Sequence, residues 1–112
     1  MQYMLLICYD ETFTPAEELE PETVAWVEEM DGRNVRISGD RLRPPSDATT
    51  LRMRDDEVLL TDGPFAETKE QLGGFYLIEA RDLNDAIRVA SKIPSARVGA
   101  IEVRPIMELN PQ

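Results

Sequence analysis

The chain contains no histidine, a single cysteine and few aromatic residues among its 112 residues. Without histidine, Ser-His-Asp and Cys-His catalytic arrangements and any histidine general base are excluded. One cysteine excludes an internal disulfide and, with no histidine beside it, a His/Cys zinc site. The longest apolar run, Met4 to Tyr9, is far too short to cross a bilayer. No basic segment followed by an apolar stretch opens the chain, so we expect no secretory signal and a cytoplasmic location.

Positive charge is scarce, with 12 basic against 22 acidic residues and a formal net charge of −10. Residues 10–31 contain acids and no lysine or arginine, whereas residues 33–54 are rich in arginine. The overall acidity argues against nonspecific binding to nucleic acid and against binding to an anionic membrane surface. Two interpretations of the separated charges stay open: two solvated faces, or an arginine patch that attracts a small anion or an acidic partner.

The length predicts a single domain, residues 1–112, with one core. Apolar periodicity and turn residues predict elements in the order β-α-β-β-β-β-α-β. The predicted strands are Gln2–Tyr9, Val35–Leu42, Thr49–Arg54, Glu57–Thr61, Leu72–Ala80 and Gly99–Pro105, and the predicted helices are Glu22–Arg33 and Leu83–Ile93. This order contains a split β-α-β pair with an inserted hairpin, which is typical of a ferredoxin-like α+β fold.

Local signals set expectations for the ends and faces of these elements. Pro21 is expected near the start of the first helix, after a loop or short helical turn with Thr14 as a candidate cap, and Asn34 is expected in the left-handed conformation that ends the helix. Asp82 is expected to cap the second helix, and alternation of apolar residues with arginines predicts a half-buried strand over Thr49–Arg54. The stripes predicted to face the core are Val24, Val27 and Met30 on the first helix, and Leu83, Ala86, Ile87, Ala90 and Ile93 on the second.

Two strands, Gln2–Tyr9 and Leu72–Ala80, are apolar on both of their faces. Two helices can cover only one face of such a sheet, and an apolar face without helices needs a partner. The simplest partner is a second copy in a two-fold arrangement, so we expect a homodimer.

The run Asp62-Gly63-Pro64-Phe65-Ala66-Glu67-Thr68-Lys69-Glu70, continued by Gln71-Leu72-Gly73-Gly74-Phe75-Tyr76, resembles the signature of the DGPF branch of the YCII-related family. The flanks agree in Tyr3-Met4-Leu5-Leu6-Ile7, Ser38-Gly39-Asp40-Arg41-Leu42 and Ile93-Pro94-Ser95-Ala96-Arg97, so the resemblance covers almost the whole chain. It implies a dimeric α+β barrel of ferredoxin-like subunits whose two sheets pack face to face.

The same resemblance implies little about chemistry. Some members of the family are proposed to use a histidine–aspartate pair, one resembles a dehydrochlorinase acting on a chlorinated hydroxyquinol, and DGPF members often accompany extracytoplasmic-function sigma factors. The absent histidine prevents transfer of the pair to this chain. On the aspartate side, Asp62 is the residue that matches the motif.

Asp62 has two interpretations. It precedes Gly-Pro, where an aspartate commonly bonds downstream backbone amides in a turn, or it acts as a general base or ligand anchor at the mouth of a pocket. Glu67 and Lys69 are two residues apart and point the same way in an extended segment. They form either a surface ion pair or a pair that orients a substrate and stabilises a developing oxyanion.

Arg41 and Tyr76 complete the candidate ligand-binding residues. Arg41 is either a solvated edge charge or part of a fork that binds a carboxylate or phosphate. Tyr76, like Tyr9, either packs in the core or lines a pocket with its hydroxyl. The Gly73-Gly74 pair is expected where a backbone or ligand approaches closely, and Cys8 is expected to be inert. No metal or cofactor is expected.

Two functions of different classes follow from these residues. The first is a small-molecule site, binding or enzymatic, that takes a small acidic or phenolic ligand beside the Asp62–Glu70 loop and uses Asp62 as base with Lys69 or an arginine as anion stabiliser. The second is a non-catalytic dimeric regulatory or protein-interaction module, associated with sigma-factor systems, whose acidic residues 10–31 dock on a basic partner. The residues alone do not decide whether the chain is an enzyme.

Overall fold

The computed structural model describes residues 1–10, 16–66 and 68–108. In chain order its elements are β1 (Gln2–Asp10), α1 (Ala16–Gly32), β2 (Arg36–Arg41), the short 3-10 turn η1 (Pro45–Asp47), β3 (Thr49–Arg54), β4 (Glu57–Asp62), β5 (Glu70–Glu79), α2 (Leu83–Ser91), the 3-10 turn η2 (Pro94–Arg97) and β6 (Ala100–Pro105).

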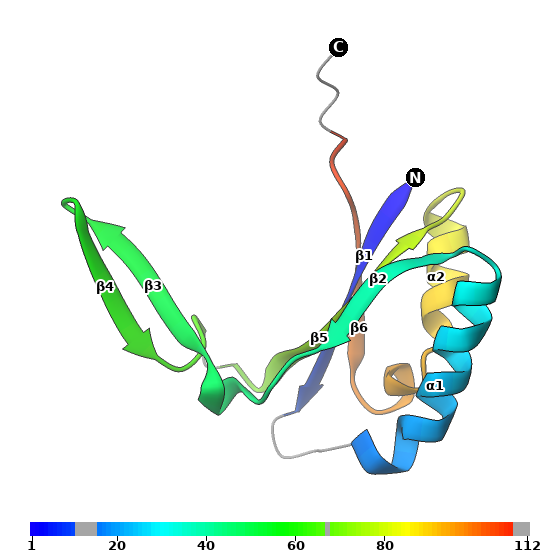
Figure 1. The fold of residues 1–112 in the computed structure, drawn as a ribbon, viewed down its shortest axis with the longest axis horizontal. Helices are drawn as coiled ribbons and strands as arrows, with labels where there is room; N and C mark the ends of the chain where they lie inside the picture. The colour runs from blue at the N-terminus through cyan, green and yellow to red at the C-terminus, as the bar shows by residue number, and fades with distance from the viewer. Residues whose placement is uncertain (11–15, 67, 109–112) are drawn as a thin grey trace.

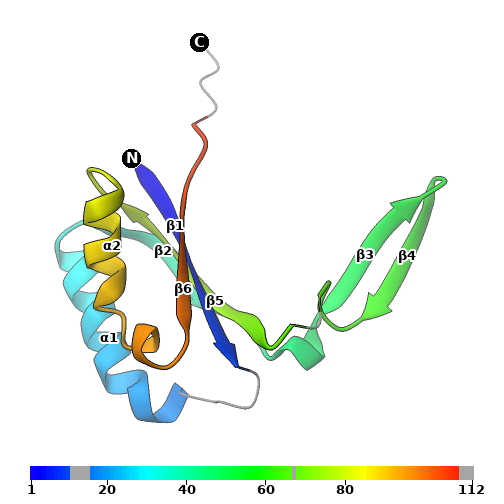
Figure 2. The ribbon, with the colours of Figure 1, turned by 180° about the vertical axis from the view of Figure 1, so that it is seen from behind.

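The main sheet has four antiparallel strands in the order β2-β5-β1-β6, and β3 pairs only with β4 in a separate hairpin. Both helices lie on one side of the main sheet, and the hairpin stands away from it on the other side (Figures 1 and 2). Without the hairpin, the connectivity is β-α-β-β-α-β, the ferredoxin-like arrangement. The predicted α+β class and order of elements are therefore confirmed.

The core lies between the sheet and the two helices. Tyr3, Leu5 and Ile7 alternate along β1 and are buried there, as the period of two along a strand requires. The other members of the buried cluster come from α1, β5, α2 and the segment after α2: Trp26, Met30, Ile78, Ala80, Ala86, Val89, Ala90 and Ile93. Within the described ranges, no helix is both long and apolar enough to cross a membrane.

Helix α1 begins earlier than the sequence predicts. It runs from Ala16, so Pro21 lies inside it rather than near its start, and Thr14 lies outside the described residues. The expected start at Glu22 was wrong because a proline deletes one helical hydrogen bond without ending a helix whose later turns are held by packing. That packing uses Trp26 and Met30, whereas Val24, predicted to face the core, is about half exposed.

The C-terminal end of α1 confirms its predicted cap. Asn34 has φ of 58°, the left-handed conformation that ends many helices. Its N–H donates to the carbonyl of Asp31 at 3.1 Å, and the N–H of Val35 donates to the carbonyl of Met30 at 2.8 Å. These two bonds make a Schellman motif, which turns the chain sharply into β2.

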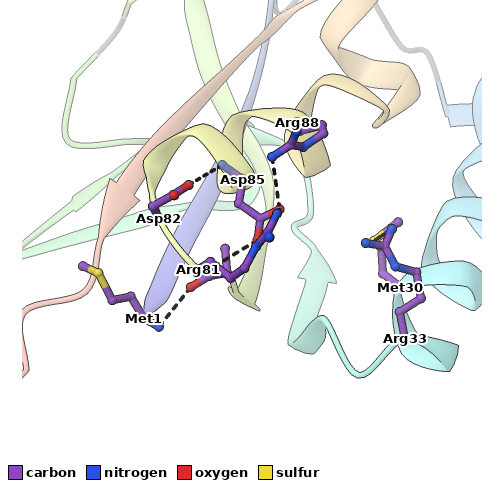
Figure 3. A network of polar contacts seen from close by, with 8 residues as sticks. Met1, Met30, Arg33, Arg81, Asp82, Asp85 and Arg88 are labelled. Carbon is purple, nitrogen blue, oxygen red and sulfur yellow. Dashed lines mark hydrogen bonds and ion pairs between the residues drawn. The ribbon is translucent and has the colours of Figure 1, made fainter.

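Helix α2 confirms its predicted N-cap, since the Asp82 carboxylate accepts a hydrogen bond of 2.8 Å from the N–H of Asp85. The Asp85 carboxylate then pairs with Arg81 and Arg88 around the first turns (Figure 3). The predicted apolar stripe is only partly correct. Leu83 and Ile87 are about half exposed, and Val89 is buried instead, because the helix is rotated relative to the stripe read from periodicity.

The β3–β4 hairpin is closed by the predicted Asp55-Asp56 turn, in which φ is 52° and 63° at the two residues. The prediction that β3 is half-buried was wrong for this chain. Leu51 is 59% exposed and Met53 is 51% exposed, because the hairpin projects from the main sheet and neither helix reaches it.

The face of the main sheet opposite the helices carries an apolar row in its two central strands. On β1 and β5, Met4 is paired with Leu77 and Leu6 with Phe75, out of phase with the buried residues. All four are partly exposed in the single chain. The sheet therefore presents apolar side chains on a face that no element of the described chain covers.

Candidate functional site

A cavity of about 50 Å³ opens between the helix side of the main sheet and α1. It is several times the roughly 10–15 Å³ that one water needs, so a carboxylate-sized group can enter while the rest of a ligand stays outside. Its lining comes from the end of β1, the end of β2, the middle of β5, α1 and η2: Ile7, Tyr9, Leu19, Thr23, Asp40, Arg41, Gly73, Gly74, Phe75, Tyr76 and Ser95.

Two hydroxyl groups meet in this cavity although 86 residues separate them in the chain. The Tyr9 and Ser95 hydroxyl oxygens are 2.6 Å apart, and either can be the donor. Ser95, at the start of η2, is only 4% exposed. Because one hydroxyl proton forms the mutual bond, the other remains available to a ligand or a neighbouring acceptor.

Two glycines, Gly73 on β5 and Gly99 just before β6, make room for the Tyr9 ring. A Cβ added to Gly73 would come within 2.6 and 2.7 Å of two ring carbons of Tyr9, and one added to Gly99 would clash with the carbonyl of Cys8 and lie 3.3 Å from the ring. Gly73 is the extra residue of a β-bulge, since Ile7 pairs with Gly74 but the next residue of β1 pairs with Leu72. The bulge and the glycines together place the Tyr9 hydroxyl against Ser95.

At Gly74 the backbone of a neighbouring strand comes close. It pairs with Ile7 on one side and Arg41 on the other, and a Cβ there would lie 3.1 Å from the carbonyl oxygen of Asp40. The expected close approach of a backbone is confirmed at Gly74, whereas at Gly73 the Tyr9 side chain comes close instead. Since directly paired residues share a face, Arg41 lies on the same side of the sheet as buried Ile7.

Tyr76 supplies a third hydroxyl. Its ring packs against Trp26 with centroids 4.6 Å apart and an interplanar angle of 50°. Burial raises the pKa of Tyr76, Tyr9 acts in the same direction, and Arg36 and Arg41 act against them. At neutral pH Tyr76 is therefore a protonated hydrogen-bond donor. No hydrogen bond to its hydroxyl is found within the described residues, so it can serve a ligand.

Arg41 provides positive charge beside these hydroxyls. Its side chain is exposed, and among the described side chains (residues 1–10, 19–66 and 68–108) no carboxylate forms an ion pair with it. Arg43, two residues along, is instead paired with Asp47 at 2.8 Å. A guanidinium without an ion-pair partner in the described part of the chain, next to neutral hydroxyl donors, suits an anionic oxygen ligand.

The structure separates the site residues named from the sequence into two places. Arg41 and Tyr76 line the same cavity. Lys69 is exposed and lines a different, open cleft at the base of the hairpin with Ser46, Thr68 and Gln71. Glu67 lies outside the described residues.

Asp62 ends β4 with an exposed side chain. The general-base interpretation of Asp62 stays a prediction, and its side chain is exposed to water in the single chain. The alternative was a turn in which the carboxylate accepts hydrogen bonds from downstream amides; in the described part of the chain the Asp62 carboxylate accepts no hydrogen bond. The turn is held instead by the Gly63 N–H, which donates to Ala48, and by the Thr50 hydroxyl, which donates to Gly63.

Ser95 is the functional candidate that the sequence did not single out. A single serine after a proline matches no sequence motif that predicts a site, and only the tertiary fold brings Ser95 next to Tyr9. The surroundings of Cys8 favour the inert thiol that the sequence predicts. Burial raises the pKa of its thiol, with Glu102 and Glu70 adding to the shift, so the reactive thiolate is disfavoured.

The exposed acids of α1 are partly neutralised by the chain's own arginines. Glu22 forms an ion pair with Arg97 at 2.8 Å, and Asp31 forms one with Arg36 at 2.8 Å. Glu29 pairs with Arg33, four residues further along the chain, at 3.4 Å. Less unpaired negative charge is then left for a basic partner. Within the described residues, no group of three or more acidic or cysteine side chains is placed to hold a metal ion.

Comparison with known sequences supports one family. The sequence profile of the YCII-related domain matches residues 1–110. The chain belongs to the YCII-related domain family. It is also 36% identical over 123 aligned residues to an uncharacterized protein of Rhizobium meliloti (strain 1021), with 95% of this chain and 93% of that protein covered. The YCII-related domain therefore accounts for the sheet, both helices and the cavity between them.

Proposed function

We propose that this YCII-related domain binds a small organic acid or phenol in the cavity between β1, β5 and α1. The observation that carries the proposal is the pair of hydroxyls at 2.6 Å, Tyr9 and Ser95, lining one cavity with Arg41 and Tyr76. Arg41 pairs with the ligand's negative charge, and Tyr76 donates its proton to a ligand oxygen. The apolar lining residues Ile7 and Leu19 suit the part of the hydrocarbon next to the bound group.

The reaction class that this site favours is proton transfer without histidine. The hydroxyl of Tyr9 or Ser95 that is not used in the mutual bond can give a proton to a bound ligand and recover it through the pair. Binding is the core of the proposal and proton transfer is its enzymatic extension. The Asp62–Glu70 loop, with Asp62 and Lys69, is the rival location.

We further propose that the chain belongs to the DGPF branch and that it forms a homodimer through the helix-free face of its main sheet. The run Asp62–Glu70 supports the branch. The partly exposed row of Met4, Leu6, Phe75 and Leu77 supports the dimer, because two such faces packed together would remove both rows from water.

A thermal-shift screen with benzoate, phenol and short-chain carboxylates tests the binding proposal. A ligand at 100 times its dissociation constant adds about 2.7 kcal/mol to the stability of the folded state, which is readily measured. With a ligand found, Arg41→Gln and Tyr76→Phe should abolish or strongly reduce the stabilisation. Arg43→Gln is the matched control, because Arg43 is a nearby exposed arginine that does not line the cavity.

Two further variants distinguish ligand binding in the cavity from ligand binding at the Asp62–Glu70 loop. Asp62→Asn and Lys69→Ala should leave the ligand-induced shift unchanged if the cavity is the site. If these two remove the shift while Arg41→Gln and Tyr76→Phe retain it, the ligand binds at the loop and the proposal for the cavity is wrong. Absence of stabilisation by any compound in the panel would contradict binding of this ligand class.

A further inference from the structure

The β3–β4 hairpin has one apolar face that nothing in the described chain covers. Strand register pairs Leu51 with Leu60 and Met53 with Val58, and paired residues share a face. These four side chains are between 51% and 65% exposed. The opposite face carries Thr50, Arg52, Thr61 and Leu59, and Arg52 lies 5.2 Å from the Phe65 ring centroid.

A two-stranded hairpin of this kind is marginally stable in water by itself. The strands β3 and β4 make their substantial contacts with each other and not with the main sheet or the helices. An exposed row of leucine, methionine and valine on such a hairpin indicates that a partner surface completes its packing.

The dimensions of the chain show how much surface is left for that partner. The accessible area is 8141 Å², compared with roughly 6,200 Å² for a compact chain of this mass. The radius of gyration is 16.0 Å, compared with about 13 Å for a compact domain of this length. The excess area exceeds the roughly 800 Å² per partner that a standard stable interface buries.

The position of the hairpin favours a second copy of this chain as the partner. In both views the hairpin stands on the side of the main sheet that has no helices (Figures 1 and 2). A second copy packed on the helix-free face would therefore lie on the same side as the hairpin. In a two-fold arrangement both copies would cover both apolar surfaces at once.

We infer that the β3–β4 hairpin is a dimerisation arm, which packs the apolar face formed by Leu51, Met53, Val58 and Leu60 against a second copy of the chain. The inference rests on the homodimer proposed above and adds to it a second contact region. The arm carries no part of the ligand cavity, so its role is assembly.

Sedimentation equilibrium of the full chain, over a dilution series through the micromolar range, tests the arm. Leu51→Ser and Leu60→Ser should each raise the dimer dissociation constant at least about tenfold, because each removes a leucine from a buried contact in both copies. Leu59→Ser is the matched control: Leu59 is a neighbouring leucine, 45% exposed, on the opposite face of the hairpin. It should change the constant by less than about threefold.

The outcomes separate the two proposals. A wild-type dimer whose constant is unchanged by Leu51→Ser and Leu60→Ser overturns the arm and leaves the sheet-face dimer standing. Equal weakening by Leu59→Ser also overturns the arm, because the effect would not follow the apolar face. A wild-type chain that stays monomeric at the highest concentration overturns both proposals.

A measurement on the unchanged chain covers the case in which a variant does not fold. Amide hydrogen exchange in residues 49–62 should slow when the concentration is raised from monomer to dimer, since packing protects the hairpin from opening. Equally fast exchange at both concentrations, with the dimer confirmed by sedimentation, would overturn the arm. Fluorescence of Trp26, buried in the main core, reports whether each variant keeps its fold.

Discussion

Replacing Gly73 by alanine tests how the cavity is built. The new Cβ would lie 2.6 and 2.7 Å from two carbons of the Tyr9 ring, so the ring must move. Forced overpacking costs about 1–3 kcal/mol, and the lost Tyr9–Ser95 hydrogen bond adds roughly 0.5–1.5 kcal/mol where it breaks. At about 2.1 cal/mol/K of unfolding entropy per residue, each kcal/mol lowers the Tm of this chain by roughly 4 °C. We expect a fall of at least several degrees.

Thermal and urea unfolding at fixed protein concentration are the assays. The first gives the Tm, and the second gives the free energy of unfolding from a separately fitted midpoint and m-value. Gly32→Ala is the matched control. Nothing lies within 4 Å of a Cβ at Gly32, which is the last residue of α1, so alanine should be neutral or slightly stabilising. Wild-type stability in Gly73→Ala, with the Tyr9 side-chain resonances unchanged, would refute the assignment of Gly73 as the space for the Tyr9 ring.

Three other predictions concern caps, charge and faces. Asp82→Ala should cost about 0.5–2 kcal/mol in urea unfolding by removing the N-cap of α2, whereas Asp82→Asn should retain most of the stability. Hydrogen bonds from the N–H and the side chain of Arg81 lower the pKa of Asp85. The Asp85 carboxylate therefore contributes fully to folding stability above about pH 4, and this contribution is lost as the pH falls further. The acid unfolding curve of Asp85→Asn should lack that loss, and a curve parallel to that of the wild type would contradict the prediction. Ile78→Arg should prevent folding because Ile78 is fully buried, while Leu77→Arg should give a folded monomer by circular dichroism and sedimentation; similar behaviour of the two variants would contradict the assigned faces.

Much of the fold is predictable because its determinants are local. Asn34 and Asp82 mark helix ends through their own backbone and side-chain preferences, and the structure has both in those roles. The Asp55-Asp56 turn is likewise confirmed. The start of α1 is not local in this sense, since the packing of Trp26 and Met30 sustains a helix that runs through Pro21.

The β3–β4 hairpin shows that hydrophobic periodicity predicts a strand without predicting how deeply the strand is buried. Alternation in Thr49–Arg54 correctly predicts a strand with one apolar face, but it does not say what covers that face. The prediction of a half-buried strand assumed a cover within the same chain, and Leu51 and Met53 are exposed because the hairpin projects from the sheet.

The candidate site was predictable only in part for a similar reason. Arg41 and Tyr76 were named from residue chemistry, and the structure brings them into one cavity. Their neighbours Tyr9 and Ser95 meet across 86 residues through a bulge and two glycines. No local pattern encodes that meeting. The Asp62–Glu70 run is the most distinctive stretch of the sequence, yet Asp62 and Lys69 lie away from the cavity lining.

The central claim is that the cavity beside Tyr9 and Ser95 binds a small acid or phenol. The most direct measurement is a titration of the isotopically labelled chain with benzoate, followed by amide chemical shifts in two-dimensional spectra. The account predicts saturable shifts concentrated at Gly73, Gly74, Tyr76 and Ser95, with residues 62–71 little changed. Shifts concentrated in residues 62–71, or no saturable shift at any of these amides, would contradict it.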